Sequence, residues 1–220
     1  MTDRSNRMWG FASILGLLLL QVPASAGESA PASEPQATEA VAAVERLHAV
    51  LIEVMKEAEP LGYQGRYDRL SPVLQEIFDL PFMAEKSVGR HWKTISPEDR
   101  EALVKTFIRY SIANYAGRFH GYSGQHFETL AEEPSARGTR MVRTRLVDPN
   151  DEDVKLDYRL RSTGGEWKIV DVYLNGTVSE LALRRSEYSS LIKRDGLEAL
   201  LAALDQRIDS LASAPADQEG

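Results

Sequence analysis

The hydrophobic residues repeat with a helical period as far as about residue 120, and with a twofold period from about residue 126 to residue 174. This change constrains the fold more than any other feature. A helix buries residues three or four apart, whereas a strand buries every second residue. A helical period returns after residue 180. The order of helices, then strands, then helices predicts the α+β class.

Four helices are expected before the change of period, over about 39–59, 64–78, 82–89 and 97–120. Pro60 and Gly62 should end the first of these helices, and Pro72 is compatible with a bend or a break in the second. Ser96 is a suitable N-cap for the fourth, whose apolar stripe is rich in aromatic residues and should face the core. Two more helices are expected near the C-terminus, over 181–193 and from Asp195 onward.

Four strands are expected, over 126–130, 139–147, 154–162 and 167–174. In the third, apolar and charged residues alternate, so one face should be buried and the other solvated. The fourth is apolar on both faces and should be central. Thr163-Gly164-Gly165 closes a hairpin, and Asn175-Gly176 turns the chain out of the sheet. We therefore predict a twisted four-stranded antiparallel sheet packed against several helices.

The first 26 residues have the pattern of a signal peptide. Arg4 and Arg7 precede an apolar core over 11–20, and Ala24-Ser25-Ala26 is a small-x-small cleavage site. This core is shorter than the stretch of about 20 residues that spans a bilayer; an uncleaved anchor is the alternative. We expect cleavage after Ala26 and a periplasmic location.

Composition divides the remaining chain into one domain with short flanking segments. Residues 27–38 are rich in Ala, Pro, Ser and Glu, and should form a disordered leader. The apolar periodic pattern of 39–212 predicts a single α+β domain. The last residues, 213–220, should form a polar disordered tail.

Composition also excludes several classes of function. A net charge of −7 and the lack of a basic run argue against nucleic acid as a partner. The chain has no cysteine, which excludes disulfides, thiolate metal sites, cysteine nucleophiles and a lipoprotein anchor. It carries no common hydrolase motif, phosphate loop or dinucleotide fingerprint. Its four histidines lack a metal-ligand pattern, so neither a metal nor a cofactor is predicted.

Asp171 is the ionisable residue that most needs an explanation. It lies in the middle of the most apolar strand, where an isolated carboxylate would cost several kcal/mol. One interpretation is a general base in a pocket, as in small isomerases built on a curved sheet. The interpretation that we favour is structural: an ion pair, with Arg184 or Arg185 as the candidate and Arg185 preferred, or a bond to loop amides.

Several segments together resemble the MlaC family of periplasmic lipid-binding proteins, also called the toluene-tolerance auxiliary family. Each segment is a loose match, but their order and spacing over about 39–211 make the resemblance fairly specific. The matching segments are Phe82-Met83, Val88-Gly89-Arg90-His91-Trp92, Ser96-Pro97-Glu98-Asp99-Arg100, 107–115, Trp167-Lys168-Ile169-Val170-Asp171-Val172, Gly176, Arg185-Ser186-Glu187-Tyr188, Ile192, Gly196 and Leu200.

The resemblance implies a soluble monomeric carrier that moves a phospholipid between an inner-membrane ABC transporter complex and an outer-membrane lipoprotein complex. The lipid would occupy an apolar pocket between the sheet and the helices, with its headgroup near solvent. Two features differ from the usual pattern. Glu180 places an acid where the family is usually apolar, and segments 78–82 and 119–124 look more like the hopanoid-associated branch, HpnM. A hopanoid-like lipid is therefore a second candidate cargo.

A lipid carrier of this kind needs a deep apolar cavity, because each buried CH₂ contributes ~0.8 kcal/mol. We expect the wall to come from the apolar faces of the strands and the helices. The predicted lining residues are Phe82, Met83, Phe107, Tyr115, Phe119, Val142, Leu156, Tyr158, Leu160, Val170, Val172 and Leu174. Two other functions stay open: a small-isomerase-type enzyme with Asp171 as its base, and a non-catalytic adaptor of the cell envelope.

Overall fold

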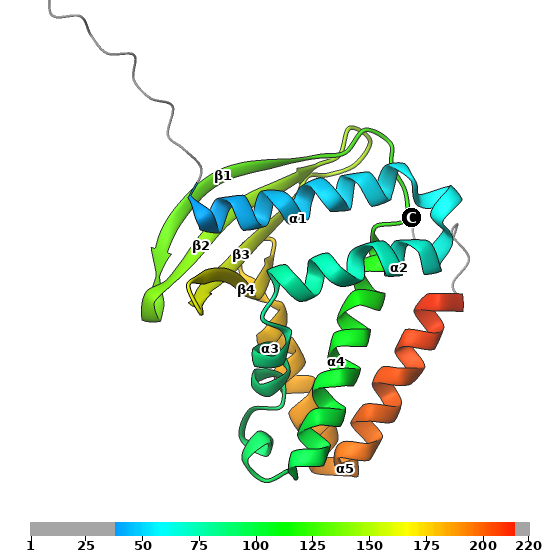
Figure 1. Ribbon diagram of the computed structural model, residues 1–220, viewed down its shortest axis with the longest axis vertical. Coiled ribbons are helices and arrows are strands. Elements are labelled where there is room, and N and C mark those ends of the chain that lie inside the picture. Colours follow the sequence, from blue (N-terminus) through cyan, green and yellow to red (C-terminus); the bar gives the residue numbers. More distant parts are fainter. Residues whose placement is uncertain (1–37, 214–220) are drawn as a thin grey trace, which may run out of the picture. The chain divides into compact units, whose positions relative to one another are not determined.

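The computed structural model describes residues 38–213, and the helices and strands in this range follow the predicted α+β order (Figure 1). The predicted signal peptide with its cleavage site, nearly all of the predicted leader and the tail after Ser213 lie outside the described residues. The elements are α1 (Glu39–Lys56), α2 (Ala58–Ile77), α3 (Leu80–Ser87), η1 (Gly89–Lys93), α4 (Pro97–Arg118), β1 (His126–Ser135), η2 (Ala136–Gly138), β2 (Thr139–Val147), β3 (Val154–Thr163), β4 (Glu166–Leu174), β5 (Val178–Ser179) and α5 (Glu180–Ser213).

Two glycines divide what would otherwise be long continuous helices. Gly62 has φ 58° and ψ −176°, and it separates the first turn of α2 from the rest of that helix. Gly196 has φ 88° and ψ 173°, and it divides α5 into two helical segments. A residue with a side chain adopts positive φ with difficulty, so glycine is favoured at both breaks. Pro72, in contrast, lies inside α2 without breaking it.

The sheet is antiparallel in the order β1-β2-β3-β4-β5, with five strands rather than the expected four. Asn175 and Gly176 both have positive φ, 49° and 72°, as the two central positions of a type I′ turn require. The turn therefore folds the chain back along β4, where Tyr173 pairs with Ser179 and Leu174 pairs with Val178. The strand that results has two residues, which is too short to show a periodic pattern.

Strand β4 is not central, contrary to expectation. Its outer edge pairs with β5 at one end and with Phe78 at an isolated bridge to Ile169. The backbone N–H of Asp79 donates to the Ile169 carbonyl at 2.9 Å. Helices α1, α2, α3 and α5 all contact β4, which explains why a strand near the edge is so apolar.

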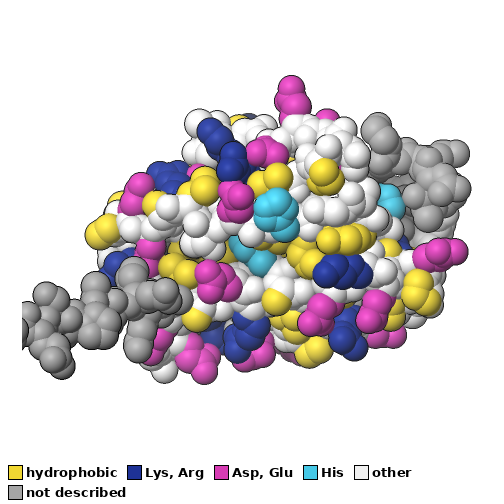
Figure 2. Space-filling model, turned by 90° about the horizontal axis from the view of Figure 1, so that it is seen from above, with side chains coloured by type: hydrophobic (Ala, Val, Ile, Leu, Met, Phe, Trp, Pro, Cys, Tyr) yellow, Lys and Arg dark blue, Asp and Glu magenta, His cyan; other side chains and the backbone are white. Residues whose placement is uncertain are grey.

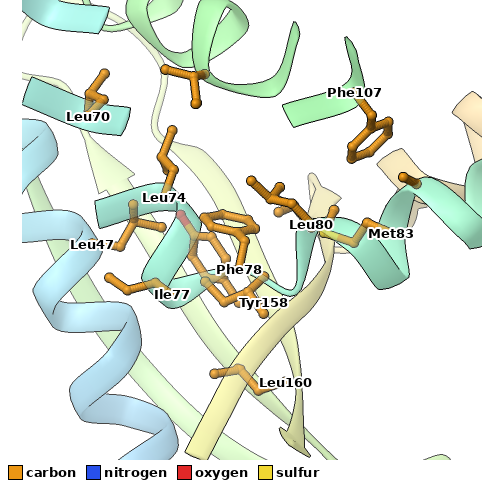
Figure 3. Packing of buried hydrophobic residues seen from close by; sticks show 14 of the residues in the cluster. Leu47, Leu70, Leu74, Ile77, Phe78, Leu80, Met83, Phe107, Tyr158 and Leu160 are labelled. Carbon is orange, nitrogen blue, oxygen red and sulfur yellow. The ribbon is translucent and has the colours of Figure 1, made fainter. Parts of the chain in front are cut away.

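Helix α1 packs against the sheet and contacts β1, β2 and β4, whereas α4 and the C-terminal half of α5 extend away from it (Figure 1). Thr38 caps α1 by accepting a hydrogen bond from the Val41 N–H at 3.3 Å. Helix α4 packs against α2, α3 and α5. The side chains of Leu74, Phe78 and Tyr158 meet between α2 and the sheet (Figure 3).

The surface carries mixed charge. Figure 2 shows Lys and Arg side chains interspersed with Asp and Glu on the face seen from above, with hydrophobic side chains in small groups between them. Among the residues that the structure describes, no helix is both long enough and apolar enough to cross a membrane.

Candidate functional site: a cavity between sheet and helices

An apolar cavity of about 240 Å³ lies between the sheet and helices α2 to α5. Each of these elements contributes part of the wall. The lining residues are Leu74, Phe78, Leu80, Met83, Ser111, Asn114, Tyr115, Arg118, Phe119, Leu146, Val154, Leu156, Tyr158, Val172, Leu174, Glu180, Leu181 and Arg184.

Two paired strands form the sheet side of the cavity. Leu156 and Tyr158 of β3 are two residues apart, so their side chains point to the same face. They lie opposite Leu174 and Val172 of β4 in the antiparallel register. Four apolar or aromatic side chains therefore form one continuous surface.

Helix α4 forms the facing wall. Ser111, Tyr115 and Arg118 are separated by four and three residues, and therefore lie along one side of the helix. The Tyr115 ring contacts Phe78 edge-on, with 5.7 Å between centroids, and stacks on Phe119 at the same centroid distance. Burial raises the pKa of Tyr115 well above its ordinary value, so this phenol is neutral.

A buried histidine, His48, is the hydrogen-bond partner of the Tyr158 hydroxyl. His48 Nε2 lies 3.1 Å from the Tyr158 Oη, and the His48 ring stacks on Phe127 with 3.8 Å between centroids. Burial lowers the pKa of His48 to about 3, because the charged imidazole would lose its hydration. A neutral side chain at this position keeps charge away from the sheet side of the cavity.

Polar and charged side chains gather where α4 meets α5. Glu180 and Arg184 lie on the first turns of α5 and form an ion pair at 3.9 Å. They line the cavity together with Ser111, Asn114 and Arg118 of α4. Within residues 38–213 no three His, Asp or Glu side chains lie together as a metal site would require. This end of the cavity is therefore suited to hydrogen bonds and charge pairing.

Seven of the predicted lining residues lie on the cavity wall: Met83, Tyr115, Phe119, Leu156, Tyr158, Val172 and Leu174. The remaining wall residues were not predicted from the sequence. Leu146 and Val154 continue the apolar face of β2 and β3, so alternation was a signal for them. Nothing in the sequence distinguishes the polar residues of α4 and α5 as lining residues.

The other five predicted lining residues lie elsewhere. Phe107, Val142 and Leu160 are fully buried in the hydrophobic core, on the same faces as wall residues but beyond the end of the cavity. Val170 is buried and lies beside the register shift between β3 and β4, away from the wall. The Phe82 ring packs instead against cations, with the Arg161 guanidinium 3.9 Å from its centroid.

The Asp171 carboxylate is hydrogen-bonded at the start of α5. It does not form the predicted ion pair with Arg185. Its carboxylate accepts from the Ser179 hydroxyl at 2.7 Å and from the Leu181 N–H at 3.1 Å. Arg185 lies elsewhere, with its guanidinium against Gly89. Asp171 does not line the cavity, because it alternates with Val172 and points to the opposite face of the sheet. This geometry matches the alternative of a bond to loop amides, and gives no support to a general base in the cavity.

A family model described as MlaC protein matches residues 45–206, most of the chain and nearly all of the described fold. The chain belongs to the MlaC family. The cavity described above is therefore a feature of an MlaC-family domain.

Curated relatives of this MlaC-family chain are distant. The chain is 26% identical over 132 residues to the "Intermembrane phospholipid transport system binding protein MlaC" of Haemophilus influenzae, covering 58% of this chain and 61% of that protein. It is 22% identical over 147 residues to the "Toluene tolerance protein ttg2D" of Pseudomonas putida, covering 66% of each. The matches thus span about two thirds or less of the length of these relatives.

A solved structure has the same fold. It is that of a phospholipid-binding protein from Ralstonia solanacearum in complex with a phospholipid. The TM-score is 0.70 with 23% identity, and the match covers 80% of this chain and 100% of the other. This likeness establishes that the arrangement of sheet and helices is shared.

Proposed function

We propose that this MlaC-family protein is a lipid carrier that performs no chemistry and holds acyl chains or another apolar lipid body in the cavity. The observation that carries the proposal is the apolar cavity between the sheet and α2 to α5. An apolar cavity of about 150 Å³ is large enough to bind benzene. A volume of about 240 Å³ suits a longer apolar segment.

The physics of lipid transfer favours such a cavity over a surface groove. Each buried CH₂ contributes ~0.8 kcal/mol, so a long acyl chain loses on the order of 10 kcal/mol when it leaves the bilayer. The cavity of a carrier must therefore make apolar contacts with the chain that recover most of this free energy. Leu156, Val172 and Leu174 provide apolar contacts on the sheet side, while Tyr115 and Phe119 provide them on the helix side.

The cellular setting is part of the proposal. After cleavage following Ala26, the domain over 39–212 would work in the periplasm as a monomer, with 27–38 and 213–220 as its flanking segments. It would receive and deliver lipid between an inner-membrane ABC transporter complex and an outer-membrane lipoprotein complex. The names of the H. influenzae and R. solanacearum proteins, which refer to phospholipid transport and phospholipid binding, support this role. A phospholipid or a hopanoid-like lipid is the proposed cargo.

Mass spectrometry of organic extracts from the natively purified protein tests the carrier function. We expect about one lipid molecule for each protein molecule. The delipidated protein should take lipid again from vesicles. A protein that is empty when purified and also fails to take lipid from vesicles would contradict the proposal.

A further inference from the structure

Two segments that are far apart in the sequence bring an excess of positive charge to one region of the fold. Residues 86–93 contain three Lys or Arg and no Asp or Glu, and residues 185–194 contain three Lys or Arg and one acid, Glu187. The first segment covers the end of α3 and all of η1, and the second lies in α5, which contacts both of these elements (Figure 1). This local excess contrasts with a net charge of −7 for the whole chain.

Direct contacts place the two segments against each other. The Arg185 guanidinium lies on the backbone of Gly89, where an added Cβ would be 2.9 Å from the Arg185 Nε. The Ser189 hydroxyl donates to the Val88 carbonyl at 3.4 Å. Lys193 follows Ser189 by four residues, and therefore lies along the same side of α5. The side of α5 that faces η1 thus carries two cations, Arg185 and Lys193.

Helix η1 adds two more cations, Arg90 and Lys93. They are three residues apart in a 3₁₀ helix, which has three residues per turn, so their side chains lie on the same side. All four cations are exposed, and none of them forms an ion pair in the described part of the chain. We define the η1–α5 patch as Arg90, Lys93, Arg185 and Lys193.

The neighbouring acids do not neutralise the η1–α5 patch. Glu187 forms an ion pair with Arg207 at 3.9 Å instead. Glu98 and Asp99 follow η1 in the sequence, and lie in the first turn of α4, where acids interact favourably with the helix dipole. Four cations against these two acids leave the patch with a net positive charge.

The patch has no exposed apolar centre, unlike a typical protein–protein interface. The Trp92 ring of η1 is half-buried, with the Arg100 guanidinium 5.3 Å from its centroid. Leu183 precedes Arg185 by two positions and therefore points to another side of α5. An anionic bilayer surface needs no apolar anchor, because its headgroups attract Lys and Arg by charge. The large hydrophobic side chains that are exposed among the described residues all lie outside the two segments: Tyr122, Leu130, Val154, Val178 and Leu183.

We propose that the η1–α5 patch docks the protein on the surface of an anionic phospholipid bilayer, with its Arg and Lys side chains against headgroup phosphates. Phosphate oxygens accept charge-assisted hydrogen bonds from both kinds of side chain. The net negative charge of the chain is compatible with docking, because physiological salt screens charges more than about 8 Å apart. None of the four residues lines the cavity, so docking is separate from lipid uptake and goes beyond the proposed carrier function.

Co-sedimentation with vesicles tests the proposal. The purified protein is mixed with vesicles of phosphatidylcholine and phosphatidylglycerol, and separately with vesicles of phosphatidylcholine alone. Binding should require phosphatidylglycerol and should weaken as salt is added. Each cation near an anionic surface strengthens binding about fivefold, so Arg90→Gln/Lys93→Gln should weaken it about 25-fold. Lys193→Gln, which leaves η1 unchanged, should weaken binding about fivefold.

Arg137→Gln/Lys155→Gln is the matched control. It removes one Arg and one Lys from exposed positions in η2 and β3, outside the two segments. Its net charge equals that of Arg90→Gln/Lys93→Gln, but its binding to the vesicles should equal that of wild type. The melting temperatures of all variants should stay near that of wild type, because the altered side chains are exposed.

Three results would overturn the inference. They are binding that does not depend on phosphatidylglycerol, wild-type binding by Arg90→Gln/Lys93→Gln, and an equal loss of binding in this variant and in the control. The first would favour an acidic protein as the partner of the patch, and the last would show that only net charge matters. The carrier function would stand in each case if the protein still takes lipid from vesicles. Failure to take lipid would instead contradict the carrier function and leave the docking result unaffected.

Discussion

His48 couples the stability of the fold to pH. Its pKa is about 3 in the folded protein, against 6.5 for an ordinary histidine. Above about pH 6.5 the residue is neutral in both states, and its protonation affects stability little. Below this pH the unfolded chain binds a proton that the folded protein excludes. The free energy of unfolding should then fall by up to about 1.4 kcal/mol per pH unit as the pH drops toward 4.

Urea denaturation at several pH values between neutral and weakly acidic measures this effect. His48→Gln can still hydrogen-bond to Tyr158 but does not titrate, so its stability should depend less on pH over this range. Equal slopes for wild type and His48→Gln would show that His48 is not responsible.

Asp171 should matter for stability rather than for lipid transfer. Asp171→Ala leaves the Ser179 hydroxyl and the Leu181 N–H without their acceptor, which should cost ~1–3 kcal/mol of unfolding free energy. The folded fraction should load lipid as wild type does. A variant with an unchanged melting temperature that has lost all lipid loading would return Asp171 to a direct functional role.

At the scale of the element, one face of strand β3 contributes residues both to the cavity wall and to the hydrophobic core. Leu156 lines the cavity, whereas Leu160, four residues further along, is fully buried in the core. In Leu156→Trp the indole can occupy cavity space, so the melting temperature should stay near that of wild type while lipid loading falls. In Leu160→Trp the same volume enters a close-packed region and should cost ~1–3 kcal/mol.

Thermal unfolding and lipid quantification of the two variants provide the measurement. A strongly destabilised Leu156→Trp that still loads lipid fully when folded would place Leu156 in the core and move the proposed lipid site. Stability near wild type for both variants would instead show that the sheet face tolerates added volume generally.

The sequence predicted the elements with a regular period, and missed those without one. Strand β3 was predicted over 154–162 and is observed over Val154–Thr163, because apolar and charged residues alternate along it. Strand β1 was expected to stop at residue 130, but continues to Ser135 past a bulge at Leu130 that breaks the alternation. Strand β5 is too short to have a period, and follows from the hairpin turn at Asn175 and Gly176.

At the scale of the whole molecule, periodicity cannot separate cavity wall from core. Phe107 and Tyr115 lie on one apolar stripe of α4, yet Tyr115 faces the cavity and Phe107 is fully buried. The difference depends on where α5 and the sheet end relative to α4, which is a matter of tertiary packing. The polar end of the cavity could not be predicted for the same reason. In the sequence, Arg118 and Arg184 are indistinguishable from ordinary surface cations. They line one cavity only because α4 and α5, which are far apart in the sequence, pack together.

The bulge at Leu130 affects how readily two copies of the protein can associate through the edges of their sheets. Strand β1 is the outer strand of the sheet, and a long regular outer strand is a template for self-association. The register shift between Thr129 and Ala131 interrupts the row of outward backbone groups near its middle. A strand from a second copy can therefore match half of this edge at a time. The bulge thus disfavours edge-to-edge pairing of two copies along the full length of β1.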